Sequence, residues 1–177
     1  MPADFPLFTL PAQMPYGPVQ SHAPETWFGN AQSDAARDMA KNTRVVLKGN
    51  YDEANAHHDD DVVRYIADND LWNQRKVAMQ IDSPADYQAC WTYIQAMYQK
   101  GDDAYHQLMS CLEHVNAGDV DVDQGDASSS VPVKIQKYNA ATAQYNAGSS
   151  CVTVANTDHT AFVSNANSFE AIIVNYG

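Results

Sequence analysis

The fold of this chain is constrained most strongly by a set of six prolines near its start. They lie at positions 2, 6, 11, 15, 18 and 24. Each proline fixes its own φ angle and disfavours a helix at the preceding residue, so residues 1–30 are predicted to form an extended arm. The arm also carries the large apolar side chains Phe5, Leu7, Phe8 and Leu10. Because such side chains avoid water, we expect the arm to pack either on the chain's own core or on a neighbouring subunit.

Length and composition predict a folded protein. The chain has 177 residues, of which 45% are hydrophobic, enough for one domain with a core. The net charge of −12 argues against broad binding to nucleic acid or to anionic membranes. The N-terminus does not resemble a secretory signal, and no 18-residue apolar run occurs. The three cysteines form no CxxC pair, which favours reduced thiols. We therefore expect a cytoplasmic protein, or one packed into a virion assembled in the cytoplasm.

Helical spacing of apolar residues dominates residues 31–117, which we expect to form a helical domain. One helix is predicted over 33–48, with Gly49 as its stop. Ser83 and Pro84 are typical of a helix start. The apolar positions after them continue to about residue 116, interrupted at Gly101, where one helix is predicted to end and the next to begin. Two helices joined by so short a turn should pack as an antiparallel hairpin.

The last third of the chain is expected to be less helical. The acidic and serine-rich residues 118–130 are typical of a flexible loop. Residues 131–177 are predicted to form one helix followed by a β meander on the same core, with strands over Cys151–Val154, Thr160–Val163 and Phe169–Val174. No internal repeat is evident. The predicted fold class is α+β, mainly helical, with the hairpin at its centre.

Four of the ten basic residues recur on one side of the first predicted helix. They are Arg37, Lys41, Arg44 and Lys48. Asp34 and Asp38 on the same helix would partly neutralise them, and a solvated stripe is the favoured interpretation. The alternative is a docking face for an acidic neighbour.

Two groups of side chains raise the possibility of a metal site. Glu53, His57 and His58 offer carboxylate and imidazole ligands that suit zinc or iron. They lack the repeated Glu-x-x-His pairs of a di-iron bundle, so surface histidines beside helix-capping acids are favoured. The alternating carboxylates of the acidic stretch resemble a calcium loop: Asp119, Asp121 and Asp123. Compared with an EF-hand calcium loop, the glycine lies one position late and Ser130 stands where the final glutamate is required. A solvated loop is therefore favoured, and we expect no metal or cofactor.

The segments around Cys90 and His159 resemble parts of the cysteine/histidine amidohydrolase-peptidase family. The resemblance implies that Cys90 is a nucleophile activated by His159, since imidazole must lower the thiol pKa to generate a thiolate. However, Cys90 lies in the second turn of a capped helix, on a stripe with Tyr87, Trp91 and Ile94. This position favours a buried structural thiol.

These observations together favour a structural role over an enzymatic one. We expect an assembly protein, for example a phage capsid, adaptor or decoration subunit, that clamps neighbouring protein subunits through its arm and is oligomeric. The two alternatives are a cysteine hydrolase of the amidase or peptidase type and a small metal-binding protein.

Overall fold

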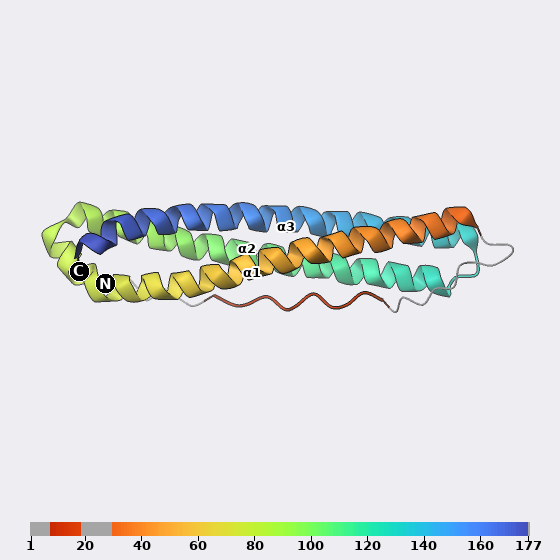
Figure 1. Cartoon of the computed structure of the whole chain (residues 1–177), viewed down its shortest axis with the longest axis horizontal. Helices are drawn as coiled ribbons and strands as arrows, with labels where there is room; N and C mark the ends of the chain where they lie inside the picture. The colour runs from red at the N-terminus through yellow and green to blue at the C-terminus, as the bar shows by residue number, and fades with distance from the viewer. Residues whose placement is uncertain (1–7, 19–29, 177) are drawn as a thin grey trace. The chain divides into compact units, whose positions relative to one another are not determined.

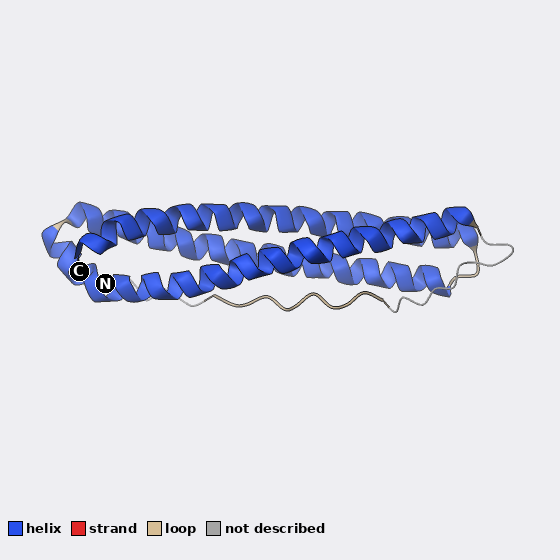
Figure 2. Ribbon diagram, in the orientation of Figure 1, coloured by secondary structure: helices blue, strands red, loops and turns tan. Residues whose placement is uncertain are grey.

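The computed structural model describes residues 8–18 and 30–176. It contains three α-helices, α1 (Ala31–Asp82), α2 (Pro84–Ala127) and α3 (Val131–Ile173), and a short 3-10 helix, η1 (Val174–Tyr176), as Figure 1 shows. No strand occurs in these residues (Figure 2). The predicted C-terminal β meander, and with it the α+β class, is therefore wrong.

The chain divides into two compact units, and each contains a segment of every helix. Unit 1 comprises Met1–Pro11, Ala54–Gln107 and Val154–Gly177, and unit 2 comprises Ala12–Glu53 and Leu108–Thr153. Side-chain pairs show that α2 runs antiparallel to the other two helices in both. In unit 2, for example, Arg37 pairs with Asp126 while Arg44, seven residues later, pairs with Asp119, seven residues earlier. Each unit is thus a three-helix bundle.

Buried residues recur at intervals of three and four along each helix. In unit 2 they include, on α1, Ser33, Arg37, Ala40, Arg44, Leu47 and Tyr51. In unit 1 the α1 series is Ala54, His58, Asp61, Tyr65, Asp68, Trp72 and Met79. This heptad spacing is the repeat of helices that pack side by side with interlocking side chains. The chain therefore does contain an internal periodicity, which charged and polar residues at core positions conceal.

The same spacing explains why the expected strands are helical. Val152, Phe162 and Phe169 belong to the three predicted strands, and all are buried on α3. Phe162 and Phe169 pack in the core of unit 1 with Trp72 and Ile94. Burial at heptad positions outweighs the modest β propensity of these segments, because propensity is a weak preference that tertiary packing overrides.

The two glycines that were expected to end helices, Gly49 and Gly101, both lie inside them. Gly101 is buried within α2, where an added Cβ would clash with the ring of Phe8. Gly148 lies within α3 and leaves room for Leu47. Gly101 and Gly148 provide space for side chains of neighbouring elements, so they need not break the helix. The predicted helical hairpin around Gly101 is consequently wrong, and α2 is continuous.

The true turns are short. Ser83 alone separates α1 from α2, and its hydroxyl accepts a hydrogen bond from the backbone N–H of Asp86 at 3.3 Å, which confirms the predicted start at Ser83 and Pro84. The predicted loop over residues 118–130 is limited to residues 128–130, because α2 extends to Ala127. Its aspartates therefore sit on a helix.

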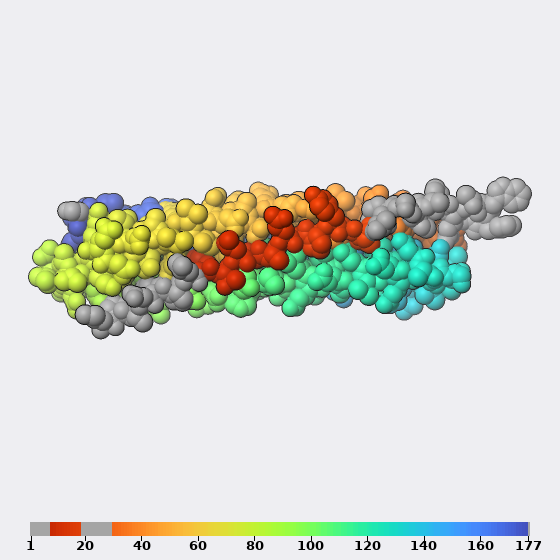
Figure 3. Space-filling view, turned by 90° about the horizontal axis from the view of Figure 1, so that it is seen from below, coloured from red at the N-terminus to blue at the C-terminus, as the bar shows by residue number. Residues whose placement is uncertain are grey.

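Residues 8–18 are extended and lie between α1 and α2 in each unit (Figure 3). In unit 1 the Phe8 ring lies 4.7 Å from the Tyr65 ring and 5.3 Å from the Tyr98 ring, measured between centroids. In unit 2 Met14 is buried and the Tyr51 hydroxyl donates to the carbonyl of Ala12. The described part of the arm thus packs on the chain's own helices. Leu10 is exposed, and Phe5 and Leu7 lie outside the described residues.

Candidate functional site

A side-chain triad built from all three helices lies in the core of unit 2. The guanidinium of Arg37 on α1 donates Nε and Nη2 to the two carboxylate oxygens of Asp126 on α2, both at 2.8 Å. The hydroxyl of Tyr138 on α3 donates to the same carboxylate at 2.7 Å. One aspartate therefore links α1 to α3.

A second triad repeats this arrangement one heptad away. Arg44 donates Nε and Nη2 to Asp119 at 2.6 and 2.7 Å, and the Tyr145 hydroxyl donates to Asp119 at 2.7 Å. Arg44 Nη2 also donates to the carbonyl of Pro15 at 3.0 Å, which connects the arm to the triad. Each member lies seven residues from its counterpart in the first triad.

A glycine precedes each triad aspartate and accommodates the tyrosine of that triad. A Cβ added at Gly118 would clash with the ring of Tyr145, and one added at Gly125 would clash with the ring of Tyr138. The two Gly-Asp pairs therefore supply both the space for a tyrosine ring and the acceptor for its hydroxyl. This seven-residue repeat of Gly-Asp pairs is visible in the sequence, but its pairing with the tyrosines was not predicted from it.

The triads are buried but electrically compensated. Arg37 and Arg44 are each only 6% exposed. The hydrogen bond to Asp126 raises the pKa of Arg37. Burial lowers the pKa of Arg44, but the hydrogen bond to Asp119 and the negative charge of Asp119 raise it by more, so the net shift is upward. Bidentate arginine–carboxylate pairs are among the strongest polar contacts in proteins, so the triads fix which layers of the three helices face each other.

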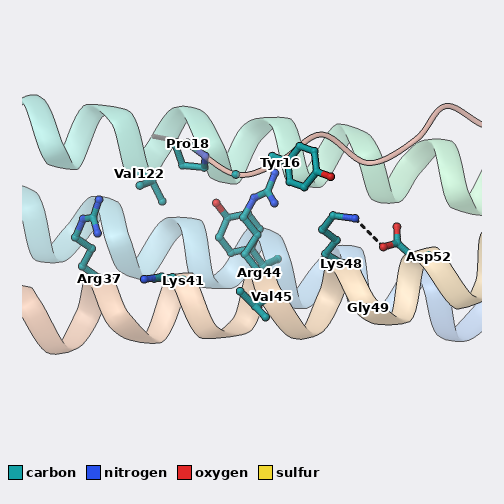
Figure 4. A pocket seen from close by; sticks show the side chains of 12 residues that line it. Tyr16, Pro18, Arg37, Lys41, Arg44, Val45, Lys48, Gly49, Asp52 and Val122 are labelled. Atoms are coloured by element: carbon teal, nitrogen blue, oxygen red, sulfur yellow. Dashed lines mark hydrogen bonds and ion pairs between the residues drawn. The ribbon is translucent and has the colours of Figure 1, made fainter. Parts of the chain in front are cut away.

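A pocket of about 410 Å³ opens beside the triads, and we call it the unit 2 pocket. Figure 4 shows Tyr16 and Pro18 of the arm on one side and Val45 of α1 on another, with Val122 contributed by α2. Gly49 also lines it, and a Cβ added there would meet no atom within 4 Å. The α1 backbone is therefore uncovered at this exposed glycine.

All four residues of the predicted basic stripe line this pocket, but they differ in their surroundings. Arg37 and Arg44 are held in the triads. Lys48 forms an ion pair with Asp52 at 2.6 Å and lies 5.6 Å from the centre of the Tyr16 ring. The Lys41 side chain is exposed, and within residues 8–18 and 30–176 it has no ion pair or hydrogen bond. The stripe is therefore not uniformly solvated.

The sequence-predicted calcium ligands do not converge. Asp119 is held by Arg44, whereas Asp121 pairs with Lys137 at 3.0 Å. Asp123 is exposed. On a helix, residues two apart point in different directions, so three alternate carboxylates cannot enclose one cation.

The proposed histidine cluster is also distributed over different neighbours. In unit 1 the His57 ring stacks on His159 at 4.4 Å between centroids. His58 instead lies 3.2 Å through Nε2 from the carbonyl of Thr9, and burial lowers its pKa. Glu53 is an exposed residue of unit 2. Among the residues that the structure describes, no three His, Cys, Asp or Glu side chains are arranged to hold a metal ion.

Cys90 and His159 are not brought together. Cys90 is fully buried in the apolar core of unit 1, and burial raises its pKa to about 12. His159 hydrogen-bonds through Nδ1 to Asp61 at 2.9 Å. Asp158, the residue before His159, pairs with Lys100 on α2. Lys100 lies ten residues after Cys90, and ten residues span about 15 Å of helix. This geometry cannot generate a thiolate–imidazolium pair.

Comparison with known protein families, with characterised proteins and with solved structures gave no match to this chain. Within the described part of the chain, no helix has both the length and the apolar composition needed to cross a bilayer. The unit 2 pocket and the surface beside it are the strongest candidates for a binding site.

Proposed function

We propose that the chain is a structural protein that assembles with other protein subunits, and that its partner is a second copy of itself. The observation that supports this most directly is the outer face of α1 in unit 2. Met39, Val45 and Val46 lie there, opposite the heptad core, and are 59%, 64% and 62% exposed. Large apolar side chains clustered on an exposed helix face are typical of an interaction surface.

The local composition of α1 favours self-association over contact with a charged partner. Residues 31–53 contain four basic and four acidic residues, although the whole chain carries a net charge of −12. Two copies can therefore approach at this face without net local repulsion. The face also carries the small residues Ala35, Asn42 and Gly49 at every seventh position, which would allow a second α1 helix to approach closely.

Measurement of mass in solution tests this proposal. We expect the full chain to be oligomeric, and Met39→Gln with Val46→Gln to shift it to a monomer of unchanged helical content. Val63→Gln with Val77→Gln is the matched control, because these valines are similarly exposed on α1 but belong to unit 1. A full chain that stays monomeric at high concentration would contradict the proposal, and a Met39/Val46 variant that remains oligomeric would exclude the α1 face as the interface.

Exchange of the arm between copies is a second route to the same assembly. Phe8 packs against Tyr65 and Tyr98 of its own chain beside Gly101, and the arm of a second copy could make identical contacts, as in domain swapping. Phe8→Ala separates the two routes. It should lower oligomerisation if arms are exchanged and leave it unchanged if the α1 face alone drives assembly.

A further inference from the structure

We propose that the unit 2 pocket binds a small amphipathic monoanion, meaning an apolar molecule of drug-like size that carries one carboxylate or sulfonate. The pocket is formed within one chain, and Lys41 and the arm residues that line it are not part of the proposed α1 contact face, although Val45 and Gly49 belong to both.

The size and lining of the pocket define the body of the ligand. Its volume of about 410 Å³ falls within the range of roughly 300–1,000 Å³ that small-molecule sites occupy. Val45, Val122 and the ring of Tyr16 give it an apolar lining, and the exposed Gly49 adds no side chain to it. An apolar group is therefore the part of a ligand that gains most from entering.

The charges around the pocket define the head group. Four of its lining residues are basic and one, Asp52, is acidic. Arg37 and Arg44 are compensated by their aspartates, and Lys48 is compensated by Asp52. Lys41 is left as the one cation of this set with no ion pair in the described residues. One uncompensated ammonium matches one anionic group.

Other classes of ligand fit less well. A polyphosphate would need several free cations, and a cationic ligand would be repelled by Lys41. A neutral apolar molecule would fill the cavity but would leave the ammonium without a partner. The monoanion is the class that uses both features of the site.

Fluorescence titration of the full chain with two related dyes tests the proposal. The probe 8-anilinonaphthalene-1-sulfonate has an apolar ring system with one sulfonate, and N-phenyl-1-naphthylamine has the same ring system without it. We expect one sulfonate dye per chain, bound about tenfold more tightly than the neutral dye, because a charge-assisted contact strengthens binding by about this factor. Equal affinity for the two dyes, or no binding of the sulfonate, would overturn the proposal.

Variants assign the binding to this pocket. Lys41→Gln should lower the affinity for the sulfonate dye to that for the neutral dye and leave the affinity for the neutral dye unchanged. Lys76→Gln, on α1 in unit 1, is the control and should change neither affinity. Gly49→Leu should fill the pocket and abolish the binding of both dyes. Asn50→Leu, one residue further along α1, is its control. The leucine replaces a glycine in an open position, so the helix should be retained. Binding that survives both Lys41→Gln and Gly49→Leu would place the dye elsewhere and refute the assignment.

Discussion

The two units share heptad packing but treat buried polar groups differently. In unit 2 the buried arginines are matched by aspartates, and the aspartates accept from tyrosines. In unit 1, by contrast, several buried side-chain atoms have no hydrogen-bond partner among the described residues. These atoms are Asn55 Oδ1, His58 Nδ1, Tyr65 Oη, Asp68 Oδ2 and Asn69 Oδ1. The same helical spacing therefore produces one core with compensated charges and another with unsatisfied polar atoms.

This difference predicts different sensitivities for the two cores. An unsatisfied buried polar atom costs about 1–3 kcal/mol, so unit 1 stores unfavourable free energy that unit 2 avoids. Asp68 can reduce that cost by binding a proton, because burial raises its pKa to about 7, whereas burial lowers the pKa of His58 and keeps it neutral. The core of unit 2 depends instead on keeping both members of each ion pair.

The largest expected effect comes from removing one member of a triad. Asp119→Ala should lower the free energy of unfolding by about 3–5 kcal/mol, because it leaves the buried guanidinium of Arg44 without its counter-ion. Denaturant-induced unfolding followed by circular dichroism measures the change.

The control replaces the whole pair with apolar residues. Arg44→Met combined with Asp119→Leu should recover most of the lost stability, because no uncompensated charge remains. If Asp119→Ala cost less than about 1 kcal/mol, the triads would not be what stabilises unit 2, and the contrast between the units would fail.

The sequence predicted local features of the fold better than the packing between helices. The helix start at Ser83 and Pro84 was recognisable because a cap depends on adjacent residues. The continuity of α2 was not, because the space that Gly101 provides is needed only once Phe8, more than ninety residues earlier in the chain, packs against it. Glycine in isolation favours a helix end, and only tertiary contact reverses that interpretation.

The four basic residues that the spacing groups on one side of a helix all line the unit 2 pocket: Arg37, Lys41, Arg44 and Lys48. Their pairing was not predicted, because the carboxylates come from α2, and which α2 layer faces α1 depends on packing that no local pattern contains. The repeated Gly-Asp pairs at 118–119 and 125–126, matched by tyrosines seven residues apart, were the available signal.

The glycines provide an intermediate effect that sharpens the comparison. Gly118→Ala should destabilise unit 2 by about 1–3 kcal/mol, because the added Cβ overlaps the Tyr145 ring and forces it from the triad. Gly49→Ala should instead stabilise by about 0.5–1 kcal/mol, since it has open space and alanine is the better helix former. Thermal and denaturant unfolding of both variants would measure this difference in sign.

Unit 1 offers the corresponding test through the arm. Gly101→Ala should destabilise the wild-type chain but have little effect in a Phe8→Ala background, where the clashing ring is absent. A double-mutant cycle measures the coupling. Equal effects in the two backgrounds would mean that Gly101 is not required to accommodate Phe8.

The remaining expected effect depends on pH and belongs to unit 1 alone. The pKa of Asp68 is raised to about 7, mainly by burial and secondly by repulsion from Glu170 on α3. The positive charge of Arg64 acts in the opposite direction. In the unfolded chain this pKa is about 3.9. The folded state therefore binds the proton more tightly, so the contribution of Asp68 to stability falls as pH rises from about 4 to about 7 and is constant above. Asp68→Asn should remove that loss and be more stable than wild type at pH 8, by a difference that decreases as the pH falls toward 4.

The difference between wild type and Asp68→Asn must be measured at several pH values, because His58 acts in the opposite direction. Burial lowers the pKa of His58, so the unfolded chain takes up that proton first as the pH falls below about 6.5, which destabilises the fold on acidification. Subtracting the two unfolding curves at each pH cancels this contribution. Asp123→Asn, at an exposed position of unit 2, should give a difference near zero throughout. A constant difference between pH 4.5 and 8 for Asp68→Asn would show that this carboxyl does not titrate in the core, and the units would then differ in hydrogen bonding but not in their response to pH.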